Sequence, residues 1–310
     1  SSPRGSPEAE RRAIMHRLPH LLLLDLAGAD VTLAFKGART LAGAPHDVIE
    51  ATLPDKSAVT LVVGRNPALL HRLEYRAYYP GLGDVVVSWN WPRWKPDAAL
   101  GFVPLGHTVE VAGATFQQVE YTRYSAGSPD AAALLNIPPE LLHPAASSGE
   151  APPQPGGPAT GEVAPGVHVE GVRGFMVMFV EFKDFVLVFD APASVIGLES
   201  VPASDQSTSE AVSEAFRQLV ARTCPGKPVR YVVISHHHGD HVGGIRAFAG
   251  SGVTVLASPG DVNAVRRALT APHRLAPDHW PPSPLPSIKA VAQAFTVTDG
   301  SRKLEVINVG

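Results

Sequence analysis

Short runs of β-branched and aromatic residues, separated by glycine, proline, asparagine or aspartate, dominate the first 142 residues. This pattern predicts β-strands joined by tight turns. The strands are expected at 48–53, 59–63, 73–79, 85–89 and 109–121. A charged first turn predicts one short helix at 7–16. Tryptophan and tyrosine side chains gather in this part and are expected to fill a core or a domain interface; they are Tyr75, Tyr78, Tyr79, Trp89, Trp91 and Trp94.

Beyond residue 161 the pattern predicts strands first and then an alternation of strands and helices. Strands are expected at 167–173, 175–181 and 185–189, and a capping-box spacing at 207–210 opens a helix that Gly226 and Pro228 end. The wholly apolar run 231–234 is typical of a strand buried on both faces. A helix is then expected near Val242, a strand at 253–257, a helix cap at 258–261 and a hairpin at Asp299-Gly300. This order predicts an α/β layered domain with a mixed sheet.

A stretch rich in proline, glycine and alanine separates the two patterns. It covers 143–161 and reads as a linker or a long surface loop. A chain of 310 residues also favours two domains over one. We therefore predict a mainly β domain at 1–142, whose role the sequence does not indicate, the linker at 143–161, and the α/β domain at 162–310.

Composition narrows the classes of partner. The net charge is −3 and evenly spread, with 13 Lys/Arg against 14 Asp/Glu up to residue 142 and 13 against 15 after it. Nucleic-acid binding is therefore not expected, because such domains are usually basic. No apolar run reaches the length of a membrane span, so we expect a soluble protein, either cytoplasmic or exported after removal of a signal peptide. The single cysteine, Cys224, excludes an internal disulfide and a cysteine-based zinc cluster.

The run SHHHGDHVGG at 235–244 carries the candidate chemistry. Imidazole nitrogens and carboxylate oxygens suit Zn²⁺, Mn²⁺ or Fe²⁺. If the extended backbone of the preceding strand continues, His236 and His238 project to one side and His237 points away. Gly239 can take the turn that reverses the chain and brings Asp240 and His241 close to the first pair. The motif thus predicts two divalent metals that share a water, at the carboxyl end of a buried strand.

This motif resembles the signature of the metallo-β-lactamase superfamily, the glyoxalase-II-like metallohydrolases. The resemblance spans about 162–310 and implies an αββα sandwich, apparently incomplete at its C-terminal end. It implies two zinc ions, with iron or manganese as alternatives, the first held by His236 and His238 and the second by Asp240 and His241. It also matches Asp190 to a buried aspartate that supports the metal loop, although a turn cap explains Asp190 equally well.

In that family a later histidine, a bridging aspartate and a final histidine complete the site. The histidines that follow the motif here, His273 and His279, lie in a proline-rich loop and are expected to be surface or lid residues. The chain therefore resembles the N-terminal part of such an enzyme. It would need a C-terminal half or a partner chain to complete the fold.

The function expected is metal-dependent hydrolysis of an ester, thioester, lactone, lactam or related bond in a small molecule. Asp240 would orient the metal-activated water and take its proton. The stretch 273–286 could form a lid, from which His279 or Trp280 would touch substrate. Three alternatives stay open: an iron-dependent oxidoreductase on the same fold, a nuclease, which the charge balance disfavours, and a non-catalytic binding or assembly module.

Overall fold

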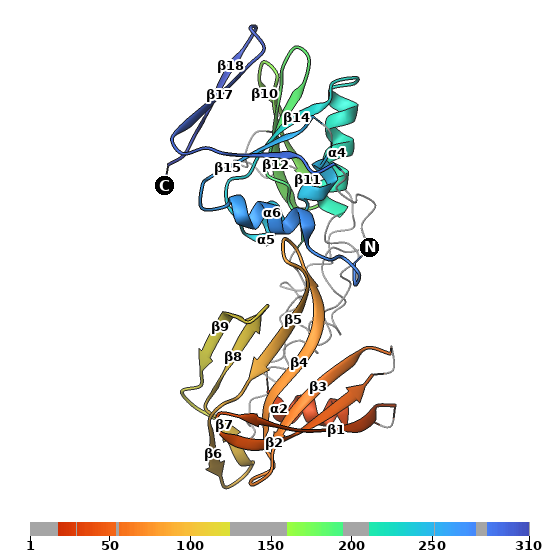
Figure 1. Ribbon diagram of the computed structural model, residues 1–310, viewed down its shortest axis with the longest axis vertical. Helices are drawn as coiled ribbons and strands as arrows, with labels where there is room; N and C mark the ends of the chain where they lie inside the picture. Colours follow the sequence, from red (N-terminus) through yellow and green to blue (C-terminus); the bar gives the residue numbers. More distant parts are fainter. Residues whose placement is uncertain are drawn as a thin grey trace, which may run out of the picture.

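A computed structural model describes residues 18–28, 30–53, 56–124, 160–194, 211–250, 252–276 and 284–309. Two seven-stranded sheets form its framework (Figure 1). The helix predicted at 7–16, the cap at 207–210, nearly all of the linker at 143–161, and both His279 and Trp280 lie outside the described residues.

The first sheet, here called the N-terminal sheet, is an antiparallel meander. Its strands, in spatial order, are β1 (Thr32–Leu41), β2 (Ala44–Thr52), β3 (Ala58–Gly64), β4 (Leu70–Tyr79), β5 (Gly83–Asn90), β8 (Gly106–Val111) and β9 (Ala114–Glu120). A separate two-stranded ribbon holds β6 (Trp94–Asp97) and β7 (Gly101–Pro104). Helix α2 (Pro19–Leu26) packs Leu22 and Leu26 into the same apolar core as Trp89 and Trp91. The aromatic cluster thus fills a core, as predicted.

The single strand predicted at 109–121 is wrong in one respect. The chain turns at Ala112-Gly113, where both residues have positive φ angles of 52° and 81°, and the run becomes the hairpin β8–β9. Two consecutive residues with positive φ are what a tight hairpin turn of the primed type requires. Strands β2, β3, β4 and β5 lie where the pattern predicts them.

The second sheet, here called the C-terminal sheet, is mixed, as the sequence predicts. Its strands, in spatial order, are β10 (Gly161–Ala164), β11 (Val167–Val172), β12 (Phe175–Glu181), β13 (Val186–Phe189), β14 (Val229–Val233), β15 (Thr254–Ala257) and β16 (Ser287–Ala290). Strands β10 to β13 pair antiparallel and β13 to β16 pair parallel. The connecting helices are α4 (Ala211–Thr223), α5 (Gly239–Val242), the 3₁₀ helix η3 (Ile245–Phe248) and α6 (Val262–Thr270).

The two faces of the C-terminal sheet are covered differently. Helical residues such as Phe216, Ile245 and Leu269 pack on one face. The other face packs against the hairpin of β17 (Ala294–Thr298) and β18 (Lys303–Ile307), which turns at Asp299-Gly300 as predicted. Of the αββα sandwich, the described residues thus form one helical layer, one complete sheet and a two-stranded element on the second face.

The tip of the β4–β5 hairpin reaches from the N-terminal sheet to the C-terminal part (Figure 1). The Asp84 amide donates a hydrogen bond to the Pro272 carbonyl at 2.8 Å, and the Asp84 carboxylate accepts from the amides of Arg274 and Leu275 at 2.9 and 3.1 Å. The Tyr78 ring meets the His273 ring edge-on at 4.9 Å between centroids. This contact, here called the seam, joins residues almost 200 positions apart.

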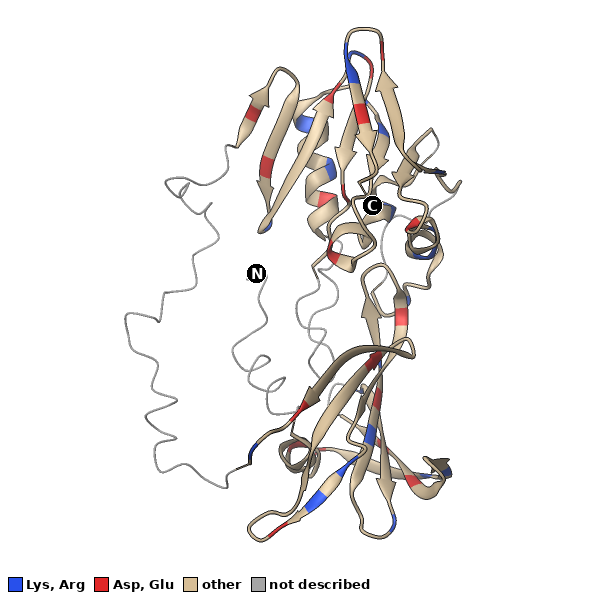
Figure 2. Cartoon of the chain, turned by 90° about the vertical axis from the view of Figure 1, so that its left-hand side faces the viewer, with Lys and Arg blue, Asp and Glu red and all other residues tan. Residues whose placement is uncertain are grey.

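Basic and acidic residues are interspersed along both sheets (Figure 2). Among the helices of the described residues, none combines the length and the apolar character that crossing a bilayer requires.

Candidate metal centre

The histidine-rich motif follows β14 at its carboxyl end. The backbone is still extended at His238, with φ −63° and ψ 147°, and α5 begins at the next residue. The His236 ring lies 4.7 Å from that of His238 and 4.1 Å from that of His241, measured between centroids. Extended backbone thus places His236 and His238 on one side, and the short helix brings His241 back to them.

Asp190 connects this motif to the neighbouring strand. It follows β13 with a positive φ of 58°, and its carboxylate accepts hydrogen bonds from the Ser235 amide at 2.8 Å and the Ser235 hydroxyl at 2.9 Å. The same carboxylate accepts from Nδ1 of His241 at 2.9 Å. That bond leaves Nε2 of His241 directed toward Asp240, whose Oδ2 lies 3.6 Å away. A carboxylate on the far nitrogen of a histidine is the usual way in which proteins orient a metal ligand.

His237 has a hydrogen-bond partner outside the motif, although its ring meets that of His238 edge-on at 5.4 Å between centroids. Its Nδ1 is 2.7 Å from Oδ1 of Asp261, and Oδ2 of Asp261 accepts from the Ser258 hydroxyl at 2.8 Å. The sequence pattern identifies Asp261 as a helix cap, and it does precede α6, but its side chain makes no capping hydrogen bond. It holds His237 instead. Sequence reasoning missed this pair because the two residues are separated by a strand.

The electrostatics of the motif favour a neutral ring at His236. Burial, followed by the nearby His241 and His238, lowers the pKa of His236. Metal ligation requires the neutral ring, so this environment leaves His236 ready to bind.

The residue types of the motif are ones that bind divalent metals. Three imidazoles and one carboxylate are ligands that zinc accepts, and no cysteine lies among them. Within the described part of the chain, three ligand atoms approach within 4.8 Å of one another at one place, and that place is not the motif. Among the described residues, the ligand atoms of His236, His238, Asp240 and His241 therefore do not form such a group of three.

The hairpin tip of the N-terminal sheet packs directly on this motif. A Cβ atom on Gly239 would lie 2.7 Å from the Pro80 carbonyl oxygen and 3.3 Å from Cε1 of Tyr79. A Cβ atom on Gly243 would lie 2.5 Å from Cβ of Pro80. Burial, and then the Asp240 carboxylate, raise the pKa of Tyr79. The sequence prediction assigned Gly239 a turn conformation, but its φ is not positive, and it is required because another segment approaches closely.

The comparisons with known proteins point to one family. Residues 202–292 match the metallo-β-lactamase superfamily. No curated protein matches the chain.

Solved structures of metallo-β-lactamases are also similar. The enzyme from Cronobacter sakazakii, a motif mutant, is 22% identical with a TM-score of 0.30, over 44% of this chain and 48% of that one. The enzyme from Pontibacter korlensis is 19% identical with a TM-score of 0.26, over 45% and 53%. SMB-1, bound to 2-mercaptoethanesulfonate, is 21% identical with a TM-score of 0.28, over 43% and 46%. The chain spans about half the length of these proteins.

The family match contains the whole motif, together with α4, β14, β15 and α6. It begins after Asp190 and excludes the N-terminal sheet. The segment 202–292, which carries the histidine motif, is thus similar to the metallo-β-lactamase superfamily.

Proposed function

We propose that the protein is a metal-dependent hydrolase of small molecules with an ester, thioester, lactone or lactam bond. The observation that supports the proposal is that the rings of His238 and His241 both lie beside the His236 ring at the carboxyl end of β14, with His241 oriented by Asp190. His236 and His238 would hold one zinc ion, and Asp240 with His241 a second. When bound, such metals supply a water of lowered pKa and polarise the bond that is attacked.

The side chains of the chain itself contribute orientation and proton transfer. Asp190 fixes the tautomer of His241 by accepting from Nδ1, which keeps Nε2 available. Asp240, which lies in the first turn of α5, would orient the nucleophilic water and take its proton. The Tyr79 ring, which lies over Gly239 beside Asp240, would narrow the approach of substrate from the N-terminal sheet. We also propose that a C-terminal half or a partner chain supplies the remaining metal ligands.

Metal analysis and hydrolysis assays test the proposal together. The purified chain is loaded with zinc, freed of excess by gel filtration, and assayed on a chromogenic β-lactam, an aryl ester, a thioester and a lactone, alone and with iron in place of zinc. We expect His236→Ala and Asp240→Ala to lose zinc and hydrolysis, while His237→Ala, which alters a ring held by Asp261, keeps both.

Equal zinc content in all three variants would overturn the metal assignment. A wild-type chain that retains zinc but hydrolyses none of these substrates, even when a C-terminal half from a family member is added, would overturn the assignment as a hydrolase. Oxygen uptake by the iron form alone would favour the oxidoreductase.

A further inference from the structure

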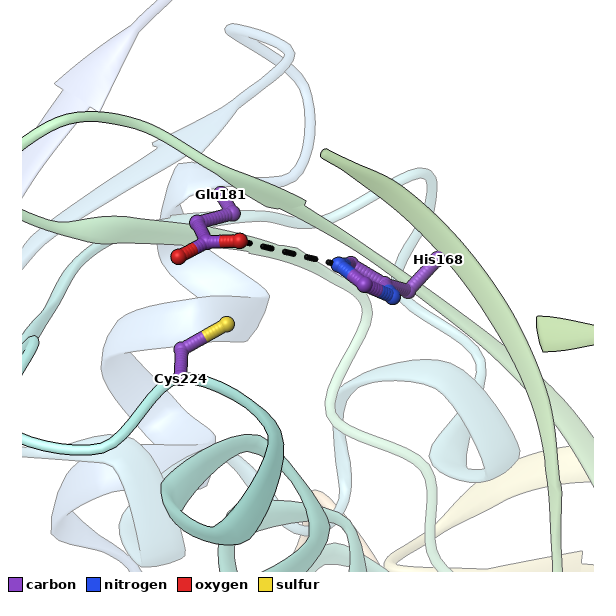
Figure 3. A group of neighbouring side chains, drawn as sticks. All are labelled: His168, Glu181 and Cys224. Atoms are coloured by element: carbon purple, nitrogen blue, oxygen red, sulfur yellow. Dashed lines mark ion pairs between the residues drawn. The ribbon is translucent and has the colours of Figure 1, made fainter. Parts of the chain in front are cut away.

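A second group of metal-binding side chains lies away from the histidine motif. His168 on β11, Glu181 at the end of β12 and Cys224 just after α4 each direct one ligand atom to a common point, and these atoms lie within 4.8 Å of one another (Figure 3). Cys224 precedes β14, whereas the motif follows that strand. At ~3.3 Å per residue the two places are ~20 Å apart, at opposite ends of the strand.

The His168 side chain places in this cluster a buried nitrogen that has no hydrogen-bond partner. The residue is 8% exposed, and its ring stacks on Phe179 at 4.6 Å between centroids with an interplanar angle of 12°. Its Nε2 atom is buried without a hydrogen-bond partner and lies 3.9 Å from Oε2 of Glu181, too far for a hydrogen bond (Figure 3). A buried polar atom left in this state in a native protein calls for a missing partner such as an ion.

Glu181 is held so that one oxygen stays available. Lys227 donates from Nζ to Oε1 of Glu181 at 2.6 Å and to the Phe182 carbonyl at 2.8 Å. The ammonium group thereby occupies Oε1 and leaves Oε2 facing His168. Lys227 also fixes the carboxylate in this position, so little ordering of Glu181 is needed when a ligand binds.

We propose that His168, Glu181 and Cys224 form a second divalent-metal site, of the zinc class, independent of the histidine motif. Thiolate, imidazole and carboxylate together are a zinc donor set, and three protein ligands leave a fourth position for water. Tetrahedral zinc places its ligand atoms about 3.4–3.6 Å apart, given bonds of about 2.0–2.3 Å. The 3.9 Å between Nε2 and Oε2 is close to this distance, and small side-chain movements bring the thiol in.

Binding at this site releases a proton. Burial and then the Glu181 carboxylate raise the pKa of the Cys224 thiol, whereas Lys227 lowers it. The metal replaces the thiol proton, which leaves to solvent past the partly exposed Glu181, and a metal–sulfur bond forms without any change in oxidation state.

Cobalt spectroscopy tests the site selectively, because Cys224 is the only cysteine of the chain. The full chain is titrated with Co²⁺, and the thiolate-to-cobalt charge-transfer band in the near ultraviolet is recorded. We expect one equivalent of this band in the wild type and in His236→Ala, none in Cys224→Ser, and at least tenfold weaker binding in His168→Ala. His46→Ala, which removes a buried histidine of the N-terminal sheet, should leave the band unchanged.

A second measurement on the wild type guards against variants that fail to fold. Zn²⁺ should slow alkylation of Cys224 at least tenfold, and a chelator should reverse this. Cobalt binding without a charge-transfer band, or alkylation indifferent to zinc, would overturn the proposal. Because His236→Ala removes only motif ligands, failure at the motif and failure at this cluster give different results.

Discussion

Replacement of Gly243 by alanine tests whether the N-terminal sheet packs on the motif as described. The added Cβ would lie 2.3 Å from the Gly239 carbonyl oxygen, 2.5 Å from Cβ of Pro80 and 2.9 Å from Cβ of Ala193. These atoms belong to backbone or to short side chains, so none can swing aside. Gly243 itself has φ −63° and ψ −27°, which alanine adopts without strain. Any cost is therefore steric, and the contact with Pro80 of the hairpin tip is one of its three sources.

The expected magnitude follows from overpacking. Inserting a methyl group into a filled site costs about 1–3 kcal/mol. Alanine also restricts the unfolded chain more than glycine does, and this stabilises the folded protein by about 0.4–1 kcal/mol. Gly243→Ala should therefore destabilise the protein by about 1–2 kcal/mol net and lower the thermal midpoint by about 2–8 °C, at about 2–4 °C per kcal/mol.

Thermal unfolding and amide exchange measure the effect, with Gly250→Ala as the matched control. A Cβ at Gly250 meets open space, and this residue does not have positive φ. The Asp84 amide, which donates to the Pro272 carbonyl across the seam, should exchange faster in Gly243→Ala than in the control. If the two variants share one midpoint and one exchange rate, the hairpin tip does not lie on α5.

Two further substitutions test other contacts, and a third tests a pH effect. Asp190→Asn should weaken zinc binding at the motif by about 10–100-fold in a chelator competition titration, because the His241 tautomer is no longer fixed; unchanged affinity would refute the support role. Asp84→Ala removes the acceptor for two amides of the seam and should cost about 1 kcal/mol in urea unfolding, with no loss if the seam is absent in solution.

Asp299→Asn tests a pH effect. Hydrogen bonds from Ser301 and from the Lys183 amide lower the pKa of Asp299 below its unfolded value of about 3.9, so its contribution is present above about pH 4 and is lost as the pH falls. The midpoint difference between wild type and Asp299→Asn should shrink from pH 7 to pH 3, and a constant difference would contradict this.

Local sequence signals predicted the elements that local sequence determines. The apolar run at 231–234 lies within or directly after β14, and the spacing that follows the cap at 207–210 gives α4. By contrast, the sequence pattern did not predict β1, whose apolar residues Leu33 and Phe35 are exposed. Helix α2 is only eight residues long, and its leucines surround the axis, with Leu22 buried and Leu24 exposed. A short apolar run of this kind does not distinguish a helix from a strand.

Contacts between distant segments were harder to predict from the sequence. The histidine motif was visible because its candidate ligands are neighbours in the chain, but His168, Glu181 and Cys224 come from three parts of the chain and share no spacing. The signals for packing between the hairpin tip and the C-terminal part were glycines: Gly83, which lies against Pro272, and Gly239 and Gly243, which lie against Pro80. From the sequence, Gly239 was interpreted as a turn, whereas a side chain there is excluded by the Pro80 carbonyl oxygen. A glycine indicates close approach without indicating which segment approaches.

The position of Asp240 and His241 depends on packing from three directions. Helix α5 has four residues, too few to be stable alone, so its neighbours must hold it. The loop after β13 does so through Ala191, whose amide donates to the His241 carbonyl and whose carbonyl accepts from the Gly244 amide. Helix α4 does so through Ser213, on which Gly244 rests, and the hairpin tip does so through Pro80. Two of these supports belong to the C-terminal part, and the third belongs to the N-terminal sheet. The N-terminal sheet is therefore a structural component of the candidate site, because it confines the helix that carries half of the candidate ligands.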